Sequence, residues 1–173
     1  LVRPERRLLL PGMDHHIAKL AGDACMSGLF VANLTNNECF YFPFSKPLRV
    51  LLRKVMSSRG QKMRDQILIA LVELLCPMLG VCKWGETLRF MLILAFSDNQ
   101  NTLAWLISLF ADNEFVQHTL RWFAAMCMKF QLCVQGAYVP TDCDFQYIFD
   151  LGSRLCDSQG REDAQAHHLF DVA

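Results

Sequence analysis

The sequence predicts an all-α fold, a bundle of seven or eight short helices around one central apolar helix. Hydrophobic residues make up 53% of the 173-residue chain, slightly more than globular proteins usually contain, so either much of the chain is buried or it keeps an apolar surface for a partner. Apolar residues recur three and four positions apart along most of its length, which is the helical period. The apolar and polar alternation of a half-buried strand is absent outside the neighbourhood of Phe40.

The N-terminal part is predicted to hold two amphipathic helices. The first covers about 14–32, where apolar residues follow the helical period. A turn-rich connection over 33–43 carries several aromatic residues, which we expect to pack onto the core. Ser45 can cap a second helix, with Pro47 tolerated in its first turn, and this helix should end near Met56.

Two strongly apolar helices should follow. Residues 63–76 are apolar almost all round, which indicates a mostly buried helix, and Pro77 is expected to interrupt it. The next helix begins near Trp84 and runs to Phe96. It is the most apolar segment and therefore the predicted central helix. Even the longest uninterrupted apolar runs, such as 90–96, are shorter than the roughly 20 residues that span a bilayer, so no bilayer span is expected.

The last third is divided by polar breaks. Residues 97–101 and 112–114 are rich in side chains that cap helices, and they delimit helices over 103–110 and 115–135. Pro140 introduces a final helix. We therefore expect one helical domain over 13–157, preceded by a leader or artificial remnant over 1–12 and followed by a polar tail over 158–173.

Charge and cysteine content restrict the function classes. The 17 basic and 17 acidic residues cancel, and the basic residues of 49–64 are spaced like the solvated face of a helix, so nucleic acid is not an expected partner. The eight cysteines are spread through a chain large enough to need no covalent cross-links. We expect free thiols and a reducing compartment.

No local signature of catalysis is visible. The sequence has no Gly-rich phosphate loop, nucleophile elbow, His-Glu-x-x-His or Cys-x-x-Cys, and its acidic residues are scattered. The expectation is a protein that is not an enzyme and holds neither cofactor nor metal. An enzyme whose site is assembled from distant residues is the remote alternative.

One ordered set of motifs resembles the Bcl-2 family. Its first homology motif, Glu-Leu-Phe, a spacer and Asn-Trp-Gly-Arg, is similar to Leu71-Val72-Glu73-Leu74-Leu75 followed by Lys83-Trp84-Gly85-Glu86 and Leu88-Arg89-Phe90. Its second motif, Trp-Ile-Gln followed by Gly-Gly-Trp, resembles Phe115-Val116-Gln117 followed by Trp122. Leu52–Ser57 is faintly like the third motif, and together these segments cover 48–122.

The resemblance implies an inhibitor of apoptosis. Members of this family hold the BH-three helix of a pro-apoptotic protein such as Bim or Bak in a surface groove. The groove residues it implies in this chain are Leu52, Val55, Met56, Met63, Ile67, Leu71, Leu75, Trp84, Gly85, Glu86, Leu88 and Arg89. Such a protein would act in the host-cell cytoplasm, with transient association with mitochondria and no stable membrane insertion. A homodimer is a further expectation.

Departures from the family pattern keep alternatives open. Glu86 stands where the family has arginine, and Arg89, one helical turn on, could replace it as the partner of an acidic ligand residue. The chain shows no tail anchor, and in this respect it resembles the short viral members of the family. A viral Bcl-2-like protein that blocks innate-immune signalling through its surface or by dimerising is the alternative function, and membrane permeabilisation is a weaker one.

Overall fold

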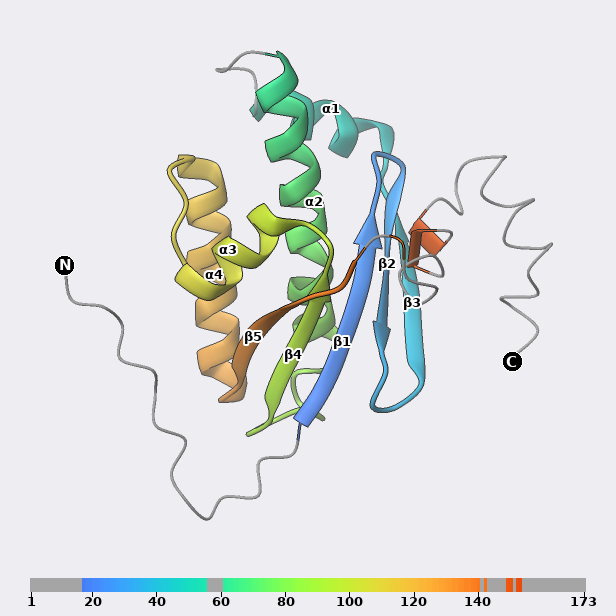
Figure 1. Ribbon diagram of the computed structural model, residues 1–173, viewed down its shortest axis with the longest axis vertical. Coiled ribbons are helices and arrows are strands. Elements are labelled where there is room, and N and C mark those ends of the chain that lie inside the picture. Colours follow the sequence, from blue (N-terminus) through green and yellow to red (C-terminus); the bar gives the residue numbers. More distant parts are fainter. Residues whose placement is uncertain (1–16, 56–60, 141, 143–148, 151, 154–173) are drawn as a thin grey trace.

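The computed structural model shows an α/β fold built on one five-stranded sheet, so the all-α prediction is wrong (Figure 1). The structure describes residues 17–55, 61–140, 142, 149–150 and 152–153. Within these residues the sheet order is β3-β2-β1-β4-β5. The expected leader over 1–12 and the expected tail over 158–173 lie outside the described residues.

The first three strands form an antiparallel meander. Strand β1 (Ile17–Ala24) pairs with β2 (Gly28–Asn33), which pairs with β3 (Glu38–Pro43). The predicted helix over 14–32 therefore corresponds to two strands and the turn between them. Strand β1 is buried from Leu20 to Ala24 on both faces, so its sequence lacks the alternation of a half-buried strand.

Two parallel strands complete the sheet. Strand β4 (Leu92–Ser97) lies parallel to β1, and β5 (Cys133–Tyr138) lies parallel to β4. The helix predicted to be central, from Trp84 to Phe96, is in fact the end of a helix, a turn and β4. Phe90 lies in that turn with φ 66°, a left-handed conformation that no helix continues through.

Four helices accompany the sheet in the described residues: α1 (Lys46–Val55), α2 (Gln61–Trp84), α3 (Gln100–Ser108) and α4 (Glu114–Phe130). Helical segments were predicted at each of these places. However, α2 continues through Pro77, which the sequence analysis expected to end it. Helix α4 ends at Phe130 because Gln131 is left-handed and donates its backbone N–H to the carbonyl groups of the last turn.

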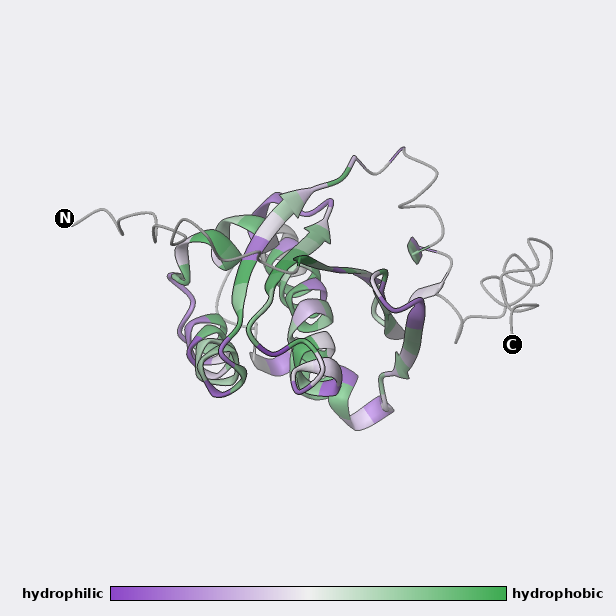
Figure 2. Ribbon diagram, turned by 90° about the horizontal axis from the view of Figure 1, so that it is seen from below, coloured by the Kyte–Doolittle hydropathy of each residue, from purple (hydrophilic) through white to green (hydrophobic). Residues whose placement is uncertain are grey.

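The main core lies between the sheet and helices α2, α3 and α4. Helix α2 packs along β1 and β2, α3 packs against β5, and α4 packs beside α2. Figure 2 shows α2 and α4 on the same side of the sheet, whose central strands are coloured mainly hydrophobic. A smaller cluster lies on the other face, where Phe149 covers Ala21 and Ala32.

Helix α2 is the central element of this core. Its segment Gln66–Trp84 has 19 residues and a mean hydropathy of 1.9, enough by length and composition to cross a membrane. Because 67% of this segment is buried inside the fold, it has the pattern of a core helix. The sequence analysis considered only uninterrupted apolar runs and therefore missed the length of this helix, and its expectation of no bilayer-spanning segment stays a prediction.

Candidate metal centre

Three carboxyl groups meet at the carboxyl end of the two parallel central strands. Asp23 lies near the end of β1, and Asp98 directly follows β4. Because β1 and β4 are parallel neighbours, their carboxyl ends lie at the same edge of the sheet (Figure 1). Glu73 reaches this edge from α2, which packs on β1. One oxygen from each carboxyl group lies within 4.8 Å of the other two.

Two of these carboxyl groups are almost completely buried. Asp23 and Glu73 are each only 8% exposed. Burial is the main reason that the pKa of Asp23 is raised from 3.8 to about 6 and that of Glu73 from 4.5 to about 8. Repulsion from Asp98 raises both further, and Asp150 acts on Asp23 in the same direction. With a pKa of about 8, Glu73 therefore holds its proton at neutral pH when no cation is bound.

Neutral donors orient the two buried groups. Ser153 donates its hydroxyl to Asp23 Oδ2 at 2.9 Å. Ser97 donates its hydroxyl to Glu73 Oε2 at 3.4 Å, and Asn99 donates its amide to Oε1 at 3.3 Å. The groups that shift the pKa values of Asp23 and Glu73 are thus other carboxyl groups and uncharged donors.

The donor set fits a hard divalent cation. Mg²⁺ and Mn²⁺ prefer oxygen ligands, and Mg²⁺ is usually bound by one or two carboxylates together with substrate phosphates. The absence of sulfur and imidazole from the cluster argues against a zinc site of the structural kind. A cation would also remove the repulsion among the three carboxyl groups, so Asp23, Glu73 and Asp98 are the residues that could hold it.

A pocket of about 550 Å³ opens beside Asp98. It lies between the start of α3 and the first half of α2. Its lining is one aliphatic side chain, the Asp98 carboxyl group and four carboxamide side chains: Gln66, Ile69, Asp98, Asn99, Gln100 and Asn101. Carboxamides both donate and accept hydrogen bonds, so the pocket can receive a polar ligand next to the carboxyl cluster.

The residues predicted to line a helix-binding groove differ widely in burial where the structure describes them. The structure buries Leu52, Leu71, Trp84, Gly85 and Leu88, half-buries Ile67 and Leu75, and leaves Glu86 and Arg89 exposed. Met56 lies outside the described residues, as do the side chains of Val55 and Met63.

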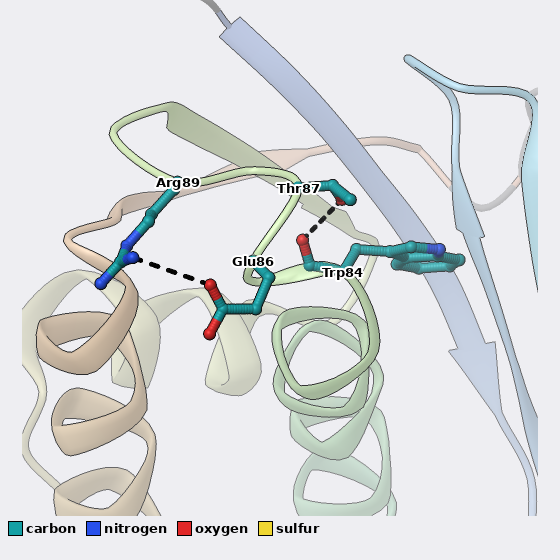
Figure 3. A network of polar contacts seen from close by, with 4 residues as sticks. All are labelled: Trp84, Glu86, Thr87 and Arg89. Atoms are coloured by element: carbon teal, nitrogen blue, oxygen red, sulfur yellow. Dashed lines mark hydrogen bonds and ion pairs between the residues drawn. The ribbon is translucent and has the colours of Figure 1, made fainter.

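Arg89, which the resemblance implied as the charge partner of a ligand, forms an ion pair within the chain. Arg89 Nη1 lies 3.8 Å from Glu86 Oε2, and both side chains are exposed (Figure 3). Thr87 donates its hydroxyl to the carbonyl oxygen of Trp84 at 2.8 Å, which closes the turn after α2. The Trp84 ring packs on Phe40 at a centroid distance of 5.4 Å. This region is therefore a helix end packed on the sheet.

Sequence reasoning missed the carboxyl cluster. Glu73 was noticed only as part of the Leu71–Leu75 motif, and Asp98 only as part of a polar break. A usable signal existed, since Asp23 and Asp98 both come at the end of short apolar runs. It could be recognised only if those runs were interpreted as parallel strands.

The comparisons with known proteins give one structural neighbour. No protein-family model matches the chain, and no curated protein sequence matches it. The solved structure of LC11 RNase H1, isolated from compost by a metagenomic approach, aligns over 80% of this chain and 91% of its own, with 11% identity and a TM-score of 0.45. Identification of the candidate site rests on the carboxyl groups and not on this likeness.

These findings correct the functional predictions drawn from the Bcl-2 resemblance. The described fold is a sheet with helices packed against it, and not the all-helical bundle that the resemblance implies. Two predictions are therefore wrong. One is the inhibition of apoptosis by binding a BH-three helix such as that of Bim or Bak. The other is the alternative of a Bcl-2-like protein that blocks innate-immune signalling through its surface. The expectations that the protein is no enzyme and has no nucleic-acid partner no longer hold as exclusions, because the acidic residues that are scattered in the sequence meet in one cluster.

Proposed function

We propose that this protein is a divalent-cation-dependent hydrolase that cleaves phosphodiester bonds in nucleic acid. The observation that carries the proposal is the convergence of Asp23, Glu73 and Asp98, with oxygens within 4.8 Å of one another, at the carboxyl edge of β1 and β4. In open α/β sheets this edge is where ligands bind.

The chemistry of the cluster favours phosphoryl transfer. A bound Mg²⁺ or Mn²⁺ would neutralise charge on a phosphoryl oxygen and make a bound water more acidic. The protein supplies the carboxyl groups that hold the cation. It also supplies the donors Ser97, Asn99 and Ser153, which fix the orientation of Asp23 and Glu73.

The pocket favours a diester in a polymer over a small phosphate ester. Among the side chains that the structure describes, its lining is rich in carboxamides and contains no lysine or arginine, which a terminal phosphate dianion would favour. Carboxamides can hydrogen-bond to bases and to ribose hydroxyl groups instead. A nucleic-acid strand could therefore place one diester at the carboxyl cluster and its neighbouring nucleotide in the pocket.

Cleavage assays with labelled single-stranded RNA, RNA–DNA hybrid and duplex DNA test the proposal, each with Mg²⁺, Mn²⁺ and EDTA. We expect cleavage of at least one substrate that requires the cation. Asp23→Asn and Asp98→Asn should each reduce it by about 100-fold or more, because each removes a cation ligand. Asp112→Asn is the matched control, since Asp112 is an exposed residue outside the cluster.

Two results would overturn the proposal. One is the absence of cation-dependent cleavage of all three substrates by folded wild-type protein. The other is cleavage that Asp23→Asn and Asp98→Asn leave as high as Asp112→Asn does. Circular dichroism of each variant separates loss of the site from loss of the fold.

A further inference from the structure

Asn99 uses both ends of its side-chain amide. Its oxygen accepts hydrogen bonds from the backbone N–H of Asn101 at 3.0 Å and of Thr102 at 3.3 Å, which makes it the N-cap of α3. Its nitrogen donates to Glu73 Oε1 at 3.3 Å. One side chain thus connects the start of α3 to a carboxyl group carried by α2.

The cap fixes which way the amide faces. If the amide were turned by 180°, its NH₂ group would meet two backbone N–H donors, and both would lose their acceptor. The oxygen is therefore committed to the helix, and the nitrogen must face Glu73. The orientation of this donor follows from the cap and needs no contribution from the carboxyl group.

The same short segment holds the other oxygen of Glu73. Ser97 donates its hydroxyl to Oε2 at 3.4 Å, and this hydroxyl accepts the backbone N–H of Asn99 at 3.1 Å. Asp98, which belongs to the carboxyl cluster, lies between Ser97 and Asn99 in the sequence. The chain from Ser97 to Asn99 thus supplies one member of the cluster and orients a second one.

We propose that Asn99 is a positioning residue, whose capping of α3 holds the Glu73 carboxylate in the orientation needed to bind a cation with Asp23 and Asp98. The proposal rests on the proposed function, because it takes the carboxyl cluster to be a cation site. Asn99 itself is not one of the clustered carboxyl groups.

Glu73 needs such a partner because its side chain is long. Three rotatable bonds separate its carboxylate from the backbone of α2, and a ligand that is free to turn loses affinity when it is ordered by the cation. Removal of a group that orients a metal ligand typically lowers metal affinity by about 10- to 100-fold. We expect an effect of that size when the Asn99 nitrogen is removed.

The chain offers a matched control in Asn113. Asn113 is the N-cap of α4, with φ −79° and ψ 121° against −89° and 111° for Asn99. Its oxygen also accepts from two backbone N–H groups, those of Phe115 and Val116. Serine is as good an N-cap as asparagine, but its side chain is too short to cap α3 and reach Glu73 together.

The test is Mn²⁺ binding to wild type, Asn99→Ser and Asn113→Ser by isothermal titration calorimetry, with thermal midpoints for all three. We expect Asn99→Ser to weaken Mn²⁺ binding about tenfold or more and Asn113→Ser to change it by less than about twofold. Both variants should melt at similar temperatures. In cleavage assays, a higher Mn²⁺ concentration should restore much of the activity of Asn99→Ser, which a general loss of structure would not allow.

A second pair of variants covers the case in which Asn99→Ser does not fold. Asn99→Asp and Asn113→Asp keep a strong cap, but only Asn99→Asp turns a donor to Glu73 into an acceptor. Equal Mn²⁺ affinity of the two members of a folded pair would overturn the positioning role and leave the proposed function intact. Wild-type protein that binds neither Mn²⁺ nor Mg²⁺ would overturn the proposed function and the positioning role together.

Discussion

Replacement of Glu73 by glutamine should stabilise the metal-free protein at neutral and alkaline pH. Folding moves the Glu73 carboxyl group to a place where its pKa is raised from 4.5 to about 8, chiefly by burial. Between these two values the folded state binds more protons than the unfolded state, so the free energy of unfolding falls as pH rises. Above the higher value the destabilisation is complete. Glutamine carries no charge, so the Glu73→Gln protein does not undergo this loss of stability at high pH.

The size of the effect follows from the interval between the two pKa values. A rise of the Glu73 pKa from 4.5 to about 8 lowers the free energy of unfolding at high pH by roughly 5 kcal/mol, at about 1.4 kcal/mol for each pKa unit. Because relaxation of a protein around a buried charge lowers the effective cost of charging, we expect Glu73→Gln to gain about 2 to 3 kcal/mol at pH 8.5. Ser97 and Asn99 can both hydrogen-bond to a glutamine amide, because a hydroxyl group accepts as well as donates.

Urea unfolding in EDTA at pH 4.5 and pH 8.5 measures this effect. The unfolding midpoint of Glu73→Gln should exceed that of wild type by about 1 M or more at pH 8.5, and the two should converge at pH 4.5. Glu86→Gln is the control, because this glutamate is exposed and should change the free energy of unfolding by less than about 0.5 kcal/mol. A Glu73→Gln protein that follows wild type at both pH values would show that the carboxyl group is not desolvated by folding.

Two further predictions concern the same edge of the sheet. Cation binding at pH 7 should release close to one proton, because Glu73 with a pKa of about 8 must lose its proton to act as a ligand, and calorimetry in buffers of different ionisation enthalpy measures this release. Gly22→Ala should destabilise the protein by about 3 kcal/mol or more in thermal unfolding, because an added Cβ would lie 2.6 Å from a carbonyl oxygen of β2 and 2.9 Å from Cys76 Cβ. A folded Gly22→Ala protein of unchanged stability would mean that β1 and α2 are less closely packed.

The helices could be predicted from the sequence more readily than the strands, for a physical reason. Helices α2 and α4 are long, so the helical period repeats often enough to be recognised. Strand β1 is buried on both faces along most of its length, and the apolar residues of β4 follow the apolar end of α2 after a short turn. Without alternation, a short apolar run is compatible with either a strand or part of a buried helix.

The candidate site could not be predicted because it depends on topology. Asp23, Glu73 and Asp98 are widely separated in the sequence, and only the parallel pairing of β1 with β4 and the packing of α2 bring them together. The polar segment 97–101 was correctly expected to contain a helix cap, which the structure places at Asn99. The second hydrogen bond of that residue, to Glu73, has no signature in the sequence.

Two of the four charged residues in the segment that suggested a Bcl-2 motif, Glu73 and Arg89, lie in different environments. An unpaired charge is costly to bury, so a charged residue in an apolar segment should face solvent or a partner. Arg89 meets this condition without any external ligand, since its side chain is 46% exposed and pairs with Glu86. Glu73 does not meet it, because it is 8% exposed and has Asp23 and Asp98 as charged neighbours. A leucine in its place would remove that cost, so the energetics of folding do not explain a carboxyl group there, whereas the proposed cation, once bound, would offset the cost.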